Sequence, residues 1–104
     1  MISESRLEKA IIYLAETDET LADAHVEMER AEFRAKATRD AIFLHSEGTV
    51  AERAAKAGVS TEYDAAMSLY FAALGGHDRI KNKRNTEELV IDVWRSIEAS
   101  RRKA

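Results

Sequence analysis

The sequence predicts an all-α protein built from long helices. Proline is absent, and the only glycines are Gly48, Gly58 and the pair Gly75–Gly76. Because these two residue types interrupt helices most strongly, residues 1–47 are left without a breaker, and residues 59–104 contain only the pair Gly75–Gly76. Apolar residues also recur at intervals of three, four or seven, the period of one helix face. The two observations predict an elongated helical hairpin of two long helices, with kinks allowed, joined by a short helix.

The first helix is expected over about residues 5–46. Ser5 is followed three residues later by Glu8, a capping box that satisfies two free backbone N–H groups at a helix start. Threonine and aspartate side chains within residues 16–20 can bond to nearby backbone and kink or restart this helix. Its main apolar face comprises Leu7, Ile11, Leu14, Leu21, Ala24, Met28, Ala31, Ala35 and Ile42.

Two further helices are expected after Gly48. Thr49 and Glu52 form a second capping box, which predicts a short helix over residues 49–57. Ser60 then begins a helix over residues 60–102. Whether this helix breaks at Gly75–Gly76, or near residue 85, where Asn85-Thr86-Glu87-Glu88 can cap a new one, is left open. Its apolar face carries Tyr63, Met67, Tyr70 and Leu74.

A chain of 104 residues is the size of a single domain, and its core is expected to be weak. Alanine supplies 18 of the 47 apolar residues, and alanine favours helix but buries little area. A hairpin covers only one stripe of each helix, so the remaining apolar surface predicts a homo-oligomeric bundle, with a dimer as the first expectation. The expected interface residues are Leu7, Ile11, Leu14, Leu21, Met28, Ile42, Tyr63, Met67, Tyr70 and Leu74.

Composition narrows the functional classes. Cysteine is absent, which excludes disulfides and thiolate zinc sites. The N-terminus lacks the basic start and apolar run of a signal peptide, and no segment approaches a membrane span, so a cytoplasmic location is expected. Residues 1–50 carry a net charge of −5 and residues 51–104 of +2. Opposite charges suit antiparallel pairing and place any polyanion contact towards the C-terminal end.

A resemblance covers most of the chain after the first helix. The segment Gly48-Thr49-Val50-Ala51-Glu52-Arg53, then Tyr63, Ala65-Ala66-Met67, Lys81-Asn82-Lys83-Arg84-Asn85-Thr86-Glu87 and Asp92-Val93-Trp94-Arg95-Ser96, resembles a family of short phage and prophage proteins of uncharacterised function. Members tend to be encoded near recombination and single-strand-binding genes. The resemblance implies an accessory role in phage DNA metabolism, in the cytoplasm of an infected bacterial host.

The basic C-terminal segment is the candidate nucleic-acid contact. Phosphates attract such cations, and an accessible aromatic ring stacks with bases. Against this, Asp78, Glu87, Glu88, Asp92 and Glu98 interleave with the cations, so the simpler interpretation is a solvated helix face with a buried tryptophan. The candidate residues are Arg79, Lys81, Lys83, Arg84, Trp94, Arg95, Arg101 and Arg102.

An enzyme is the main alternative. Carboxylate pairs resemble those with which small all-helical nucleotide pyrophosphatases hold magnesium, although the four-residue spacing of Glu88 and Asp92 departs from that family's Glu-x-x-Asp pattern. His25 lacks a second histidine at ligand spacing, and His45 suits a helix C-terminus. The other carboxylates concerned are Glu16, Glu19, Glu29 and Glu32.

The function expected from the sequence is therefore a non-enzymatic, oligomeric accessory protein. It binds a protein partner or single-stranded nucleic acid, with no catalytic residues, no metal and no cofactor. A magnesium-dependent pyrophosphatase and a purely structural oligomerisation module are the alternatives.

Overall fold

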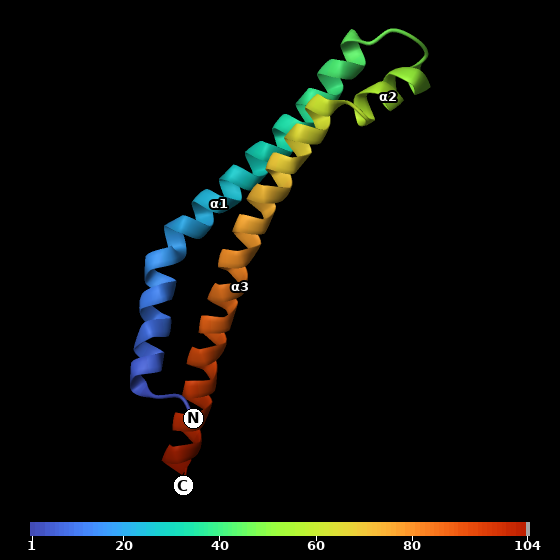
Figure 1. Ribbon diagram of the computed structural model, residues 1–104. Coiled ribbons are helices and arrows are strands. Elements are labelled where there is room, and N and C mark those ends of the chain that lie inside the picture. The colour runs from blue at the N-terminus through green and yellow to red at the C-terminus, as the bar shows by residue number, and fades with distance from the viewer. Residues whose placement is uncertain (104) are drawn as a thin grey trace. The chain divides into compact units, whose positions relative to one another are not determined.

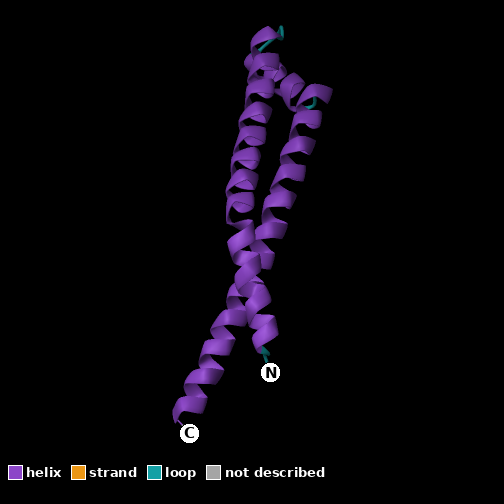
Figure 2. Cartoon of the chain, turned by 90° about the vertical axis from the view of Figure 1, so that its left-hand side faces the viewer, coloured by secondary structure: helices purple, strands orange, loops and turns teal. Residues whose placement is uncertain are grey.

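The computed structural model describes residues 1–103, which are helical almost throughout (Figure 1). Helix α1 spans Glu4–His45, α2 spans Val50–Gly58 and α3 spans Thr61–Lys103. Short links join them, and no strand occurs among the described residues (Figure 2). The predicted all-α class, with two long helices joined by a short one, is confirmed.

Side-chain caps fix where the helices begin. Ser3 Oγ accepts a hydrogen bond from Arg6 N at 3.1 Å, so α1 is capped two residues earlier than the predicted Ser5. Thr49 caps α2 by accepting from Glu52 N at 3.2 Å, as predicted. Ser60 Oγ accepts from Tyr63 N at 3.2 Å at the start of α3. These bonds satisfy N–H groups that lack a partner within the helix.

The sites at which the sequence left a break of α1 or α3 open are helical. Helix α3 continues through Gly75–Gly76 and past residue 85. The Thr86 hydroxyl donates to the Asn82 carbonyl four residues earlier instead of capping a new helix. In α1, the Thr17 hydroxyl donates in the same way to the Tyr13 carbonyl. Threonine inside a helix bonds to the preceding turn in this manner, so it does not end the helix.

The helices contribute to two compact units. The first consists of residues 1–23 with 78–103, and the second of residues 24–77. In the first unit, Arg6 bonds to Glu87 and Arg84 bonds to the Leu14 carbonyl. From Arg6 to Leu14 the residue number rises along α1, while that of the partner on α3 falls from 87 to 84. These parts of α1 and α3 therefore run antiparallel.

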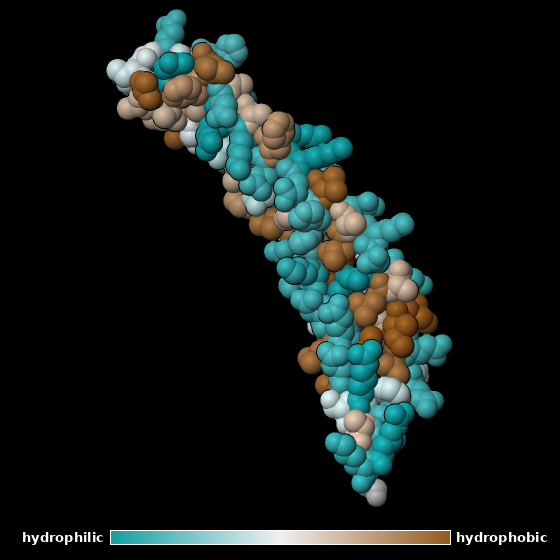
Figure 3. Space-filling model, turned by 180° about the vertical axis from the view of Figure 1, so that it is seen from behind, coloured by the Kyte–Doolittle hydropathy of each residue, from teal (hydrophilic) through white to brown (hydrophobic). Residues whose placement is uncertain are grey.

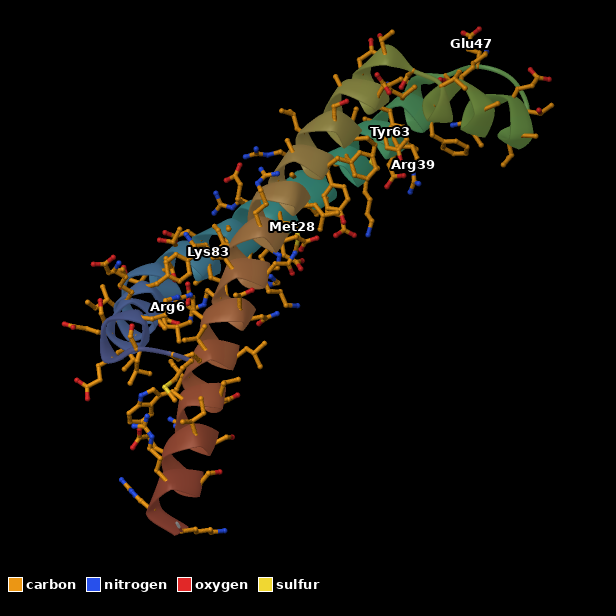
Figure 4. The ribbon with its side chains drawn as sticks, turned by 60° about the horizontal axis from the view of Figure 1, so that its bottom comes forward. Arg6, Met28, Arg39, Glu47, Tyr63 and Lys83 are labelled. Atoms are coloured by element: carbon orange, nitrogen blue, oxygen red, sulfur yellow. The ribbon has the colours of Figure 1, made fainter. Side chains whose placement is uncertain are left out.

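The second unit is antiparallel as well. The Arg39 guanidinium carbon lies 5.9 Å from the Tyr63 ring centroid, and the His25 and His77 ring centroids are 5.7 Å apart. Figure 4 shows Arg39 and Tyr63 close together. Helix α2 packs against the end of α1 through Arg53, which lies 4.4 Å over the Phe43 ring and donates to the Phe43 carbonyl.

In the described part of the chain, the buried hydrophobic residues are all alanines. Ala10 is the buried alanine of the first unit, and the second unit buries Ala31, Ala35 and Ala57. No large side chain within residues 1–103 is fully buried. Alanine lets helix backbones approach closely but removes little apolar area from water, so the core within each unit is thin.

Two glycines give opposite predictions for the same substitution. Gly48 has φ +117°, where a side chain is strained, and a Cβ there would lie 2.5 Å from Glu52 Oε2. Gly76 is helical, and apart from its chain neighbours and the backbone of its own helix turn no heavy atom lies within 4 Å of its Cβ position. We expect Gly48→Ala to lower the free energy of unfolding by about 1 kcal/mol or more, and Gly76→Ala to raise it by about 0.5–1 kcal/mol.

Urea unfolding followed by circular dichroism measures both changes. A loss of stability in Gly76→Ala would contradict an unobstructed helical position, and an unchanged Gly48→Ala would contradict the strained turn.

Candidate interaction surface

Arg84 anchors α3 to α1 in the first unit. Its Nη1 donates to the Leu14 carbonyl and to Thr17 Oγ1, each at 2.7 Å. Its Nη2 lies 3.5 Å from Asp18 Oδ1, and only 13% of the Arg84 side chain is exposed. A guanidinium presents several donors in a fixed geometry, so it can hold all three groups at once. Arg84, which was predicted to contact nucleic acid, therefore bonds to α1.

A second polar contact lies further along the same helix pair. Arg6 Nη2 donates to Glu87 Oε2 at 2.6 Å, and Glu87 is buried. Lys83 Nζ lies 4.5 Å from the Tyr13 ring centroid, a cation–π distance. In Figure 4, Arg6 from α1 and Lys83 from α3 lie between the two helices of this unit. Two predicted nucleic-acid residues, Lys83 and Arg84, thus contact α1.

The other predicted cations vary in their surroundings. Arg79, Lys81 and Arg102 are exposed. Arg95 Nη1 lies 3.8 Å from Asp92 Oδ1, and Arg101 Nη1 donates to Glu98 Oε1 at 3.2 Å. Carboxylates of the same helix therefore partly neutralise this stretch of α3.

Trp94, the aromatic residue predicted to stack with bases, is only half-buried. By helical spacing it lies three and seven residues from Ile91 and Glu87, which are half-buried and buried respectively. This is the face of α3 that carries the contacts to α1.

The residues predicted to form the oligomer interface are mostly half-buried within the single chain, and Ile11 is the exposed member. Their own chain already covers part of each side chain. The half-buried members are Leu7, Leu14, Leu21, Met28, Ile42, Tyr63, Met67, Tyr70 and Leu74.

The large apolar side chains that face solvent form a second set, which shares only Ile11 with the predicted interface. Hydrophobic residues form several patches on the face seen in Figure 3. Single exposed apolar residues are common, but this many in a chain with a thin core indicate surface that a partner covers. The set comprises Met1, Ile11, Ile12, Val26, Phe33, Leu44, Val50, Val59, Leu69, Phe71, Leu89 and Val93.

One open groove in the first unit collects several of these side chains. It has a volume of about 690 Å³. Its walls come from the C-terminal part of α3 and from the first residue of the chain. The lining residues are Met1, Leu89, Asp92, Val93, Ser96, Ile97, Ser100 and Arg101.

The carboxylates considered for magnesium lie beside nitrogen-bearing side chains or in the solvent. Glu29 Oε1 is 3.7 Å from His25 Nε2, and Glu32 Oε1 is 3.0 Å from Lys36 Nζ. Glu16, Glu19 and Glu88 are exposed. Among residues 1–103, no three His, Cys, Asp or Glu side chains are grouped so that they could hold a metal ion. His45 is the last residue of α1, as predicted.

Crossing a bilayer takes roughly twenty predominantly apolar residues, and no helix in the described part of the chain meets that requirement. Comparison with protein-family models, with curated proteins and with solved structures found no match.

The sequence interpretation missed the groove, although its signal is present. Leu89, Val93, Ser96 and Ser100 follow one another at intervals of four, three and four residues, the spacing of a helix–helix seam. The basic residues of this segment predicted a nucleic-acid contact instead. The Arg6–Glu87 contact was missed because residues far apart in a sequence carry no mark of their pairing.

Arg84 and Arg79 offer a matched test of the polar anchor. We expect Arg84→Ala to lower the free energy of unfolding by about 1.5–3 kcal/mol, because hydrogen bonds to a charged group are lost. The exposed Arg79→Ala should change it by less than about 0.5 kcal/mol. Urea unfolding of both variants checks this, and equal small effects would contradict the anchoring role of Arg84.

Proposed function

We propose that this protein is a non-enzymatic, homo-oligomeric interaction protein that acts as an accessory factor in phage DNA metabolism. One observation carries the interaction role: among residues 1–103, the buried hydrophobic residues are four alanines, whereas twelve large apolar side chains are exposed. A chain that keeps its large apolar residues at the surface gains stability when a partner covers them.

A dimer is the first assembly to consider. Two-fold dimers are the commonest closed assemblies of identical chains. Each of the two units contains a pair of antiparallel helix segments from α1 and α3, and such a pair leaves the outer face of each helix uncovered. A second pair packed on that face would make a four-helix bundle, in which apolar residues on several sides of a helix become buried.

The surroundings of the basic segment favour a protein partner over single-stranded nucleic acid. Arg84 bonds to α1, Arg95 and Arg101 lie beside Asp92 and Glu98, and Trp94 is half-buried. Phosphate binding needs unpaired cations, and base stacking needs an accessible ring. The place in phage DNA metabolism is supported by the resemblance of residues 48–96 to short phage and prophage proteins.

Light scattering with and without a single-stranded oligonucleotide tests the assembly and the ligand together. We expect a mass of at least twice the 11.7 kDa chain, unchanged by the oligonucleotide at moderate salt. Electrostatic binding weakens steeply with salt, so mass gained only at low salt would indicate non-specific phosphate contact. A complex that persists at moderate salt and is lost in Lys81→Ala would make nucleic acid the ligand, and a monomer would contradict the proposed assembly.

Nucleotide hydrolysis tests the non-enzymatic assignment. We expect no release of pyrophosphate from nucleoside triphosphates in the presence of magnesium. Magnesium-dependent turnover that disappears in Glu29→Ala or Glu88→Ala, but persists in the exposed Glu62→Ala, would replace the proposal with the pyrophosphatase alternative.

A further inference from the structure

The groove of the first unit has the pattern of one half of a helix–helix contact. Leu89, Val93, Ser96 and Ser100 lie along one side of α3 at the alternating intervals of four and three residues that mark a seam between two helices. Leu89 is 60% exposed and Val93 is 40% exposed, whereas Glu87, which bonds to Arg6 of α1, is buried. Helix α1 therefore occupies a different face and leaves this seam open.

Side-chain size along the seam indicates the orientation of a second helix. Two large residues, Leu89 and Val93, come first, and two small ones, Ser96 and Ser100, follow. If an identical segment packs antiparallel, each large residue meets a small one: Leu89 meets Ser100 of the second copy. Val93 likewise meets the second copy's Ser96. Large side chains set against small ones interdigitate and fill space.

Charge within the groove points to the same orientation. Its two charged lining residues are Asp92, towards the start of the seam, and Arg101, at its end. Antiparallel packing sets the acidic end of one copy beside the basic end of the other. Parallel packing in register would set like charges at the same height, which is unfavourable.

From these features we infer that the groove is the contact surface between two copies of this chain, related by a two-fold axis and paired antiparallel through the C-terminal part of α3. In a two-fold contact the same patch serves on both copies, so its size and charge pattern must complement itself. The Leu89–Ser100 seam and the charged pair Asp92 and Arg101 both meet that condition. The inference rests on the proposed homo-oligomeric function and names the surface that carries it.

Leu89 and Ala72 provide a matched pair for the first test. Both are exposed residues of α3, but Ala72 belongs to the other unit, does not line the groove and is not one of the large apolar side chains that a partner is proposed to cover. We expect Leu89→Asp to raise the dimer dissociation constant by about thirtyfold or more, because it places a charge at the centre of the contact. Ala72→Asp should leave it within about threefold, as a change outside the contact does.

Sedimentation velocity over a range of concentrations measures both constants, and circular dichroism verifies that each variant is helical. An oligomeric wild type whose mass is unaffected by Leu89→Asp overturns the groove as the contact surface but leaves the proposed function standing. A wild type that is monomeric throughout overturns both. Val93 also lines the groove. Dissociation of the dimer by Val93→Asp as well as by Leu89→Asp would support the contact.

Engineered cysteines test the orientation, because the natural chain has none. Leu89→Cys and Ser100→Cys are prepared separately, mixed to allow exchange of subunits, and oxidised. Antiparallel pairing predicts a disulfide-linked dimer in the mixture and little in either variant alone, since only unlike positions come within bonding distance. Cross-linking of Leu89→Cys with itself would indicate parallel pairing and overturn the inference.

Discussion

Small side chains at the centre of each helix pair are the constraint on which the rest of the molecule depends. Ala10 in the first unit, and Ala31 and Ala35 in the second, allow close approach of α1 and α3. Close helices gain dispersion contacts, but alanine removes little apolar area from water, roughly one methyl group for each residue. The large apolar residues are consequently only partly covered, or face solvent, and they remain available to a partner.

Polar contacts supply what an alanine-lined contact lacks, which is a defined register. A buried alanine such as Ala10 offers only a methyl group, so it does little to fix the height of one helix along the other. Arg84 fixes that height in the first unit, because its donors fit Leu14 and Thr17 in one register only. Burial of Glu87 against Arg6 acts in the same direction, since a slip would leave that carboxylate without its partner.

The sequence predicted local features well because short-range chemistry determines them. The turn at Gly48, the cap at Thr49 and the start at Ser60 all follow from backbone and side-chain preferences within a few residues. The division of apolar residues between intrachain contact and open surface was not predictable. Leu14 and Leu89 look alike in a sequence, and only the way that α1 pairs with α3 makes one half-buried and the other exposed.

In the proposed assembly, another copy of the chain covers the exposed apolar surface. The most direct test is the thermal midpoint of unfolding, followed by circular dichroism over about two decades of protein concentration. Because dissociation accompanies unfolding of an oligomer, mass action predicts a midpoint that rises with concentration. A midpoint independent of concentration would show that the single chain folds without a second copy, and would contradict the account.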